Sequence, residues 1–278
     1  MITGIVGLGL IGGSFAKAYK RRPDCTVYAA DINQTILDFA KISGDVDETL
    51  TDDNITECDL LLLTAYPTAI ADYLQKTAEK IDKHTIVIDC LGIKRDICKI
   101  GFELAEQYGF TYVGGHPMAG THNSGYKYAN EELFDDQPMV ITAKPDETPE
   151  TLSKVKELLE PAGFGSYAYT TPEEHDKMIA FTSQLAHVVS NAYIKSPSAE
   201  NHKGFSAGSY KDLTRVAWLK ADMWSELFLA NRDYLSNEIQ GLIDRLTEYR
   251  QAIDEQDQDR LIELLKEGCR RKREIDGR

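Results

Sequence analysis

The stretch Gly7-Leu8-Gly9-Leu10-Ile11-Gly12 decides the fold of this chain, because it matches the pattern G-x-G-x-x-G. A short apolar run precedes it, and a helical pattern with one apolar side follows it. Gly7 permits the tight turn, Gly9 lets backbone approach a pyrophosphate, and Gly12 lets helix and strand pack closely. The N-terminus of the helix offers free N–H groups to phosphates. We therefore predict that the three glycines, Leu10 and Ile11 bind a dinucleotide.

Asp31 indicates which dinucleotide is bound. It ends the next apolar run, about 20 residues after the glycine stretch, where a carboxylate accepts hydrogen bonds from the ribose hydroxyls of NAD. The same carboxylate repels the 2′-phosphate of NADP, and the three residues that follow it include no Arg to hold that phosphate. We predict NAD as the cofactor. The alternative is a glycine turn followed by an unrelated aspartate.

The two halves of the chain differ in rhythm. Up to about Thr170, short apolar runs alternate with helical patterns, which is typical of βαβ units and a parallel sheet covered on both faces. The predicted strands are 4–7, 27–31, 60–64, 86–89, 112–114 and 139–142, and the predicted helices are 10–20, 33–42, 67–80, 94–108 and 148–160. After Pro172 the pattern is helical, with apolar stripes over 239–253 and 261–269. We predict an α/β domain over 1–168 and an all-helical domain over 169–278.

Composition and charge exclude several classes of protein. The length of 278 residues suggests about two domains, and 42% hydrophobic with 27% charged residues is typical of a globular protein. The net charge of −14 disfavours nucleic-acid and membrane partners, because both are anionic. We interpret the basic run 270–273 as the end of a helix. No apolar run reaches the roughly 20 residues that a membrane span needs.

The cysteines and the N-terminus indicate a cytoplasmic protein. The five cysteines form no C-x-x-C pair, which is typical of reduced thiols rather than a disulfide framework. The N-terminus shows no basic region followed by an apolar signal core, so we expect the fold to begin at residue 1. We predict no metal site.

His116 is the first candidate for substrate chemistry. It follows a predicted strand within the glycine-rich segment 114–120, and ligands bind beyond the C-terminal ends of strands in such sheets. The alternative is a His satisfied by backbone in a tight turn. His187 belongs to a small or polar stripe on an otherwise apolar predicted helix, 173–194, and such a stripe indicates a pocket. The alternative there is a buried hydrogen-bond seam between helices.

Arg215 is a candidate carboxylate ligand. We place it near the start of a helix, after the capping pattern Ser209-x-x-Asp212, on the helix that also carries Trp218, Leu219 and Trp224. Arg binds carboxylates through two parallel hydrogen bonds. The alternative is an internal ion pair with Asp212.

Several segments together resemble the prephenate dehydrogenase family. In order and spacing they are Gly7–Ser14, His116–Gly120 with Ser124-Gly125, Leu133-Phe134, His175-Asp176, Ser183–His187 and Leu213-Thr214-Arg215. The resemblance covers nearly the whole chain. It implies a Rossmann domain followed by a helical, substrate-binding dimerisation domain, and hence a homodimer. It also implies NAD-dependent oxidative decarboxylation of prephenate to 4-hydroxyphenylpyruvate in tyrosine biosynthesis.

The resemblance implies roles for individual residues. His116 accepts the proton of the substrate hydroxyl as hydride leaves the same carbon for the nicotinamide, which suits a neutral imidazole. His187 helps to hold the substrate, and Arg215 binds one of its carboxylates. The further residues carried over are Thr121, His122, Ser124 and Gln184 for the substrate, and Gly92 for the cofactor.

The chain departs from the family pattern at three positions. Gly92 stands where many members carry Ser, so the hydroxyl that would bridge the catalytic His and the substrate is missing. Gln184 stands in place of a His, and His122 in place of a Glu. An uncharged or partly cationic pocket disfavours the ammonium group of arogenate, so we expect prephenate to be the better substrate.

Three alternatives stay open. An arogenate dehydrogenase has the same fold and acts on the amino analogue. A β-hydroxyacid dehydrogenase would carry a Lys-based catalytic pattern, and the predicted helix 173–194 lacks that pattern. A non-catalytic NAD-binding sensor needs neither a base nor a carboxylate clamp, so the combination of His116, His187 and Arg215 argues against it.

Overall fold

A computed structural model describes residues 1–121 and 123–277. Their contacts divide the chain into two compact units. The first consists of Met1–Ile179 and Trp218–Leu227, and the second of Ala180–Ala217 and Phe228–Arg278. The predicted fold class, an α/β Rossmann domain followed by a helical region, is confirmed. The boundary after residue 168 stays a prediction.

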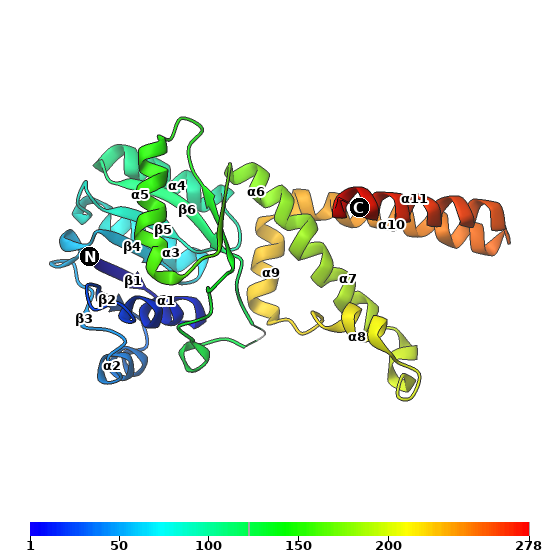
Figure 1. Cartoon of the computed structure of the whole chain (residues 1–278), viewed down its shortest axis with the longest axis horizontal. Coiled ribbons are helices and arrows are strands. Elements are labelled where there is room, and N and C mark those ends of the chain that lie inside the picture. Colours follow the sequence, from blue (N-terminus) through cyan, green and yellow to red (C-terminus); the bar gives the residue numbers. More distant parts are fainter. Residues whose placement is uncertain (122, 278) are drawn as a thin grey trace. The chain divides into compact units, whose positions relative to one another are not determined.

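An eight-stranded sheet forms the centre of the first unit (Figure 1). All neighbouring strands are parallel except β6 and β7, which are antiparallel. The predicted parallel sheet therefore holds except at this edge, where β7 is antiparallel to β6 and β8 adds a strand that the sequence pattern does not predict. In order across the sheet the strands are β3 (Glu48–Thr49), β2 (Thr26–Ala30), β1 (Ile2–Val6), β4 (Leu60–Leu63), β5 (Ile86–Asp89), β6 (Thr111–Pro117), β7 (Pro138–Thr142) and β8 (Ser166–Thr170).

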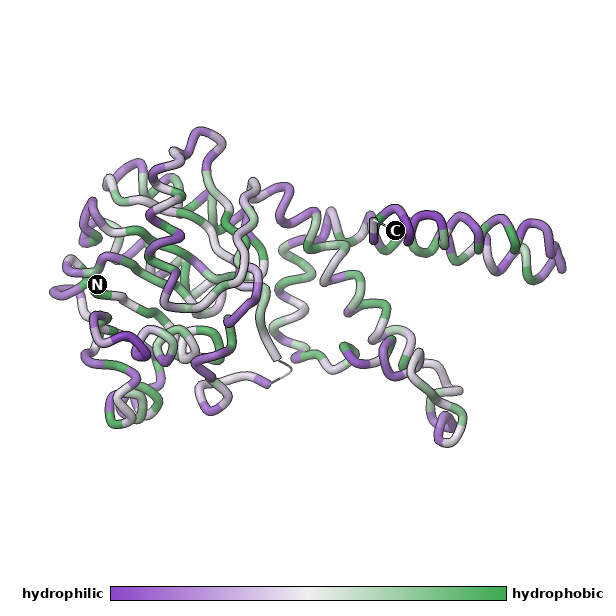
Figure 2. The backbone as a smooth tube through the Cα atoms, in the orientation of Figure 1, coloured by the Kyte–Doolittle hydropathy of each residue, from purple (hydrophilic) through white to green (hydrophobic). Residues whose placement is uncertain are grey.

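Helices cover both faces of the sheet. An apolar cluster of strand and helix residues is buried on each face. The strand β4 illustrates this, since all four of its leucines are fully buried. Figure 2 shows the hydrophobic colour concentrated on the inner strands of this unit. One face carries α1 (Leu10–Lys20), α2 (Gln34–Ile42) and α5 (Pro149–Leu159), and the other carries α3 (Pro67–Thr77) and α4 (Arg95–Tyr108).

The rest of the described chain is helical. The helix α6 (Pro172–Ile179) belongs to the first unit, and α9 (Ala221–Ala230) begins in the first unit and ends in the second. The second unit contains a π-helix (Ala180–Leu185), α7 (Ala186–Tyr193), α8 (Gly208–Thr214), α10 (Arg232–Asp254) and α11 (Gln258–Asp276). Within it, α10 packs against the π-helix and against α11. In the described residues, every helix is too short or too polar to cross a membrane.

Candidate active site

The glycine stretch forms a tight turn between β1 and α1. Gly7 has φ +95°, a left-handed conformation that favours glycine. A Cβ on Gly12 would lie 1.9 Å from the carbonyl oxygen of Gly7 and 2.3 Å from Thr64 Oγ1, so a larger residue does not fit there. A Cβ on Gly9 meets no described atom within 4 Å, so a ligand can approach the backbone at that point. Among the described residues no side chain caps α1, which leaves its first N–H groups available to phosphate.

Asp31 is fixed beside this turn. The backbone N–H of Leu8 donates to Asp31 Oδ2 at 2.6 Å, and the N–H of Asn33 donates to Oδ1 at 2.7 Å. A carboxylate oxygen can accept more than one hydrogen bond, so both oxygens can also accept from ribose hydroxyls. The turn and Asp31 together have the features that a bound NAD requires. The contacts of the individual residues with NAD stay predictions.

His116 lies inside β6, and the expectation that it follows the end of its strand is wrong. The parallel neighbour β5 ends at Asp89, which pairs with Gly114. The strand β6 continues to Pro117 because the antiparallel β7 pairs with it, and His116 lies opposite Val140 in that register. The half-buried imidazole of His116 is thus carried beyond the carboxyl edge of the parallel part of the sheet.

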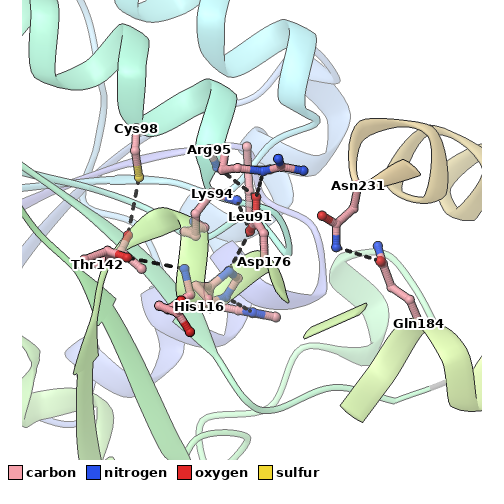
Figure 3. Close-up of polar contacts among 12 residues, drawn as sticks. Leu91, Lys94, Arg95, Cys98, His116, Thr142, Asp176, Gln184 and Asn231 are labelled. Atoms are coloured by element: carbon pink, nitrogen blue, oxygen red, sulfur yellow. Dashed lines mark hydrogen bonds and ion pairs between the residues drawn. The ribbon is translucent and has the colours of Figure 1, made fainter. Parts of the chain in front are cut away.

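A chain of hydrogen bonds leads from His116 to α6. His116 Nδ1 lies 2.9 Å from His175 Nε2, and His175 Nδ1 lies 2.7 Å from Asp176 Oδ1. The side chains of His175 and Asp176 are buried. Figure 3 shows His116 and Asp176 at the centre of this polar cluster. His116 is therefore satisfied by another side chain, rather than by backbone in a tight turn.

Burial favours the neutral form of both rings. It holds the pKa of His116 well below the ordinary value of 6.5, and the charges of His175 and Lys94 lower this pKa further. Burial also lowers the pKa of His175, where the hydrogen bond to Asp176 opposes the shift and Lys94 adds to it. At pH 7 His116 is therefore an uncharged imidazole, the form that can accept a proton.

A buried ion pair supports the backbone beside His116. The side chains of Lys94 and Asp89 are fully buried, and Lys94 Nζ donates to Asp89 Oδ1. Lys94 Nζ also donates to the carbonyl oxygen of Gly115 at 2.6 Å, and Tyr112 Oη donates to Asp89 Oδ2 at 2.7 Å. This network holds the residue that precedes His116 in the chain.

Gly92 faces the ring of His116. A Cβ on Gly92 would lie 3.9 Å from both Cε1 and Nε2 of His116, and 3.9 Å from Leu227 Cδ2. These are ordinary contact distances, so the serine of the family pattern would fit here beside the imidazole. The side of His116 that carries Nε2 is therefore the side where a hydroxyl could reach it. The contact of Gly92 with a cofactor stays a prediction.

The predicted helix 173–194 is not one continuous α-helix. Its α6 part ends at Ile179, the π-helix Ala180–Leu185 follows, and α7 begins at Ala186. Segments of π-helix occur frequently at functional sites. This one contains Ser183 and Gln184, two residues of the segment that carries the family resemblance.

The two candidate residues of this region have different surroundings. His187 Nδ1 donates to the backbone oxygen of Ser183 at 2.8 Å, so a neutral ring carries its lone pair on Nε2. Gln184 is only 1% exposed, and its Oε1 accepts a hydrogen bond from Asn231 Nδ2 at 2.9 Å (Figure 3). The Gln184–Asn231 pair is a buried seam within the second unit. Binding of substrate by Gln184 and His187 stays a prediction.

Arg215 directly follows the last turn of α8, so its predicted place near the start of a helix is wrong. Trp218 lies in a non-helical stretch, and Trp224 belongs to the next helix, α9. Arg215 is exposed, and no ion pair joins it to Asp212 in the part of the chain that the structure describes. Its role as a carboxylate clamp stays a prediction.

The loop after β6 carries the remaining candidates. Thr121 is exposed, and its Oγ1 accepts a hydrogen bond from the N–H of Asn123 at 3.2 Å. Ser124 is also exposed and lines a cavity of about 420 Å³ with residues of α2 such as Phe39. His122 lies outside the described residues.

The structure brings some of the predicted residues into one unit. The glycine stretch, Asp31, Gly92 and His116 belong to the first unit, while His187, Gln184 and Arg215 belong to the second. Sequence reasoning missed His175 as the partner of His116. The signal was the adjacent pair His175-Asp176, which stands in the family pattern without an assigned role.

Two family models match successive parts of the chain. The family described as "Prephenate dehydrogenase, nucleotide-binding domain" matches residues 15–167, and "Prephenate dehydrogenase, dimerization domain" matches residues 171–267. A cyclohexadienyl dehydrogenase of Zymomonas mobilis is 32% identical over 95% of this chain and 92% of its own length.

Two solved structures are similar over almost their whole length. An arogenate dehydrogenase of Synechocystis has a TM-score of 0.81 and 28% identity, and covers 98% of this chain and 99% of its own. A prephenate dehydrogenase of A. aeolicus, in complex with hydroxyphenyl propionate and NAD+, has a TM-score of 0.80 and 27% identity, and covers 99% and 98%.

Proposed function

The chain belongs to the prephenate dehydrogenase family of NAD-dependent oxidoreductases, and from this premise we propose that it converts prephenate to 4-hydroxyphenylpyruvate. The observation that carries the proposal is the neutral, hydrogen-bonded imidazole of His116 beyond the carboxyl edge of the sheet. Ligands of such sheets bind at that edge. The glycine turn that fits NAD belongs to the same unit of the chain.

The oxidative decarboxylation of prephenate requires one proton acceptor on the protein. The hydroxyl carbon of prephenate loses a hydride, and the hydroxyl proton moves to Nε2 of His116. The bond to the ring carboxylate breaks, CO2 leaves, and the electron pair of that bond completes the aromatic ring. The phenolic oxygen then recovers the proton from His116. Bound NAD supplies the acceptor for the hydride.

This chain has residues that suit the cofactor. The N–H groups at the start of α1 would hold the pyrophosphate, with Gly9 open to its approach. Asp31 would accept hydrogen bonds from the ribose hydroxyls, and its charge would exclude a 2′-phosphate. The residues that hold the nicotinamide end include Gly92 in this proposal.

Prephenate rather than arogenate is the proposed substrate. Arg215 is exposed and would pair with a substrate carboxylate through two hydrogen bonds. His122, outside the described residues, stands where many members of the family carry Glu, so that acid is not present to match an ammonium group. We expect a preference of at least about tenfold in kcat/KM, which corresponds to about 1.4 kcal/mol. The alternative is arogenate, because the Synechocystis neighbour is an arogenate dehydrogenase.

A side-by-side assay tests the proposal. The protein is mixed with NAD and either prephenate or arogenate, and NADH is followed by its absorbance while the product is identified by mass. We expect 4-hydroxyphenylpyruvate from prephenate at the higher kcat/KM. A higher kcat/KM for arogenate would overturn the substrate assignment. Binding of NAD without turnover of either compound would favour a sensor.

Organisation and location complete the proposal. The matched ranges 15–167 and 171–267 support a nucleotide-binding domain over 1–168 and a helical substrate-binding and dimerisation domain over 169–278. We propose a homodimer that works in the cytoplasm. All five cysteines are free thiols, which suits a reducing compartment.

A further inference from the structure

The hydrogen-bond chain Asp176–His175–His116 has one direction. A carboxylate only accepts, so at 2.7 Å from Asp176 Oδ1 the Nδ1 of His175 carries the hydrogen. In a neutral His175 the other nitrogen, Nε2, then carries a lone pair. That lone pair faces Nδ1 of His116 at 2.9 Å, so His116 Nδ1 is the donor of the second hydrogen bond. What remains on the neutral His116 ring is a lone pair on Nε2.

Asp176 is held in place by the backbone at the start of α4. Its Oδ1 also accepts from the backbone N–H of Lys94 at 2.8 Å, and its Oδ2 accepts from the N–H of Arg95 at 3.0 Å. The guanidinium of Arg95 adds a contact at 3.3 Å between Nε and Oδ2. Two hydrogen-bond donors of the backbone therefore fix the acceptor at the far end of the chain, and its orientation does not depend on the two histidines.

We propose that His175 is a positioning residue: held by Asp176, it keeps the hydrogen of the His116 ring on Nδ1 and leaves Nε2 as the proton acceptor. The inference rests on the proposed function, in which His116 accepts the hydroxyl proton. The Nε2 atom lies on the side of the ring that faces Gly92, where a Cβ would be 3.9 Å away. Because residue 92 has no hydroxyl, orientation of His116 in this chain comes from His175.

The charges around the two rings agree with this direction. The groups that face His175 are Lys94, which lowers its pKa, and Asp176 and Asp89, which raise it, with burial as the largest effect. The pKa of His116 is lowered by burial, by His175 and by Lys94. Both rings are therefore neutral at pH 7, and a neutral pair can hold only one hydrogen between them.

Two substitutions separate the hydrogen bond from the packing. In His175→Gln the side-chain oxygen can accept from His116 Nδ1, while His175→Phe keeps a ring in the buried space but offers no acceptor. The first measurement is made on the wild type: 15N shifts of the imidazole nitrogens at pH 7.5, in protein labelled at its six histidines. The His116 signals are assigned by their loss in His116→Gln.

We expect wild-type His116 to show hydrogen on Nδ1. In His175→Phe we expect a mixture of both ring forms and a kcat lower by about tenfold or more, but by less than the full 10²–10⁴-fold that loss of a general base would cost. His175→Gln should restore most of kcat. KM for prephenate and the Kd for NAD should stay within about twofold in both variants, because neither ligand contact changes.

The outcomes are distinguishable. Hydrogen on Nε2 of wild-type His116 overturns the proposal, and this measurement needs no variant to fold. An unchanged kcat and ring form in a folded His175→Phe protein overturns it as well. Hydrogen on Nδ1 in a protein that turns over neither prephenate nor arogenate would support the positioning of His116 and contradict the proposed function.

Discussion

At the scale of single residues, the proposed reaction depends on keeping the imidazole of His116 uncharged in an acidic protein. The net charge of −14 would by itself favour a protonated His. Burial and the nearby Lys94 act in the opposite direction on the pKa of His116. Local desolvation therefore outweighs the charge of the whole molecule, because charges at a distance are screened by salt within about 10 Å.

The pH dependence of activity follows from this shift. In the proposed reaction the reactive form of His116 is neutral, so activity should fall as pH drops through the pKa of His116. Since that pKa lies well below 6.5, the acid limb of kcat/KM should lie below pH 6.5. Initial rates between pH 5 and 8, with unfolding followed at each pH as the control, would check this. An acid midpoint at or above 6.5 would contradict it.

The buried pair Lys94–Asp89 gives a prediction about stability. Removing one partner leaves the other charge buried and unpaired, so Lys94→Met should lower the free energy of unfolding by about 3–5 kcal/mol. The matched control is Lys80→Met, because Lys80 pairs with Asp52 on the surface, where solvent screens the interaction. Urea unfolding of the three proteins gives the comparison. If both substitutions lowered the free energy of unfolding equally, Lys94–Asp89 would not act as a buried ion pair.

Asp31 gives a prediction about the cofactor. Asp31→Asn keeps an oxygen for the N–H of Leu8 but removes the charge, whereas Asp31→Ala removes both. If charge excludes NADP, each variant should reduce the ratio of kcat/KM for NAD over NADP by roughly tenfold or more, about 1.4 kcal/mol. Steady-state kinetics with both cofactors measures the ratio. A wild type that uses NAD and NADP equally well would rule out this role.

At the scale of elements, the turn between β1 and α1 combines packing and binding at different glycines. Gly12→Ala should destabilise the fold by at least about 1–3 kcal/mol, because its Cβ would overlap the carbonyl of Gly7. Gly9→Ala meets no described atom, so its stability should change by less than about 0.5 kcal/mol. The Kd of the Gly9→Ala protein for NAD should nevertheless rise, because the added methyl group would lie where the pyrophosphate approaches. Thermal unfolding and titration with NAD separate the two effects, and loss of stability in Gly9→Ala would count against this division.

The sequence predicts this first part of the fold well, because glycine spacing and apolar runs are local signals. The predicted helix 10–20 has the bounds of α1. The strands β3 and β8 are missed for a physical reason. The strand β3 has only two residues, and β8 is largely exposed, so neither gives the apolar run of a buried strand.

The site is less visible in the sequence, because its partners are distant along the chain. His116 was predicted from its place near a strand end, but its contact with His175 spans 59 residues. The π-helix is hidden as well, since apolar periodicity continues from α6 into α7. Arg215 is misplaced because the helix that begins at the capping pattern is expected to continue to Trp224, whereas α8 ends at Thr214.

At the scale of the whole molecule, the second unit leaves apolar side chains uncovered. Leu246 on α10 and Leu265 on α11 are each 57% exposed. Contiguous exposed apolar residues on a folded unit mark an interaction surface. The matched dimerization domain, residues 171–267, includes both. The other large exposed apolar residues of these two helices are Ile243, Ile253, Ile262 and Ile275.

A homodimer through α10 and α11 is the prediction at this scale. Leu246→Glu should convert the dimer to monomer at micromolar concentration, because it would bury an unpaired charge in the interface. The matched control is Asn237→Glu, nine residues earlier on α10, which at 100° per residue lies on the opposite side of the helix and is exposed. Both variants add the same charge, so a general effect of charge on association would appear in both. Light scattering should give the mass of two chains for the wild type and for Asn237→Glu, and of one chain for Leu246→Glu. A wild type with the mass of one chain would contradict the dimer, and a Leu246→Glu protein that keeps the mass of two chains would place the interface elsewhere.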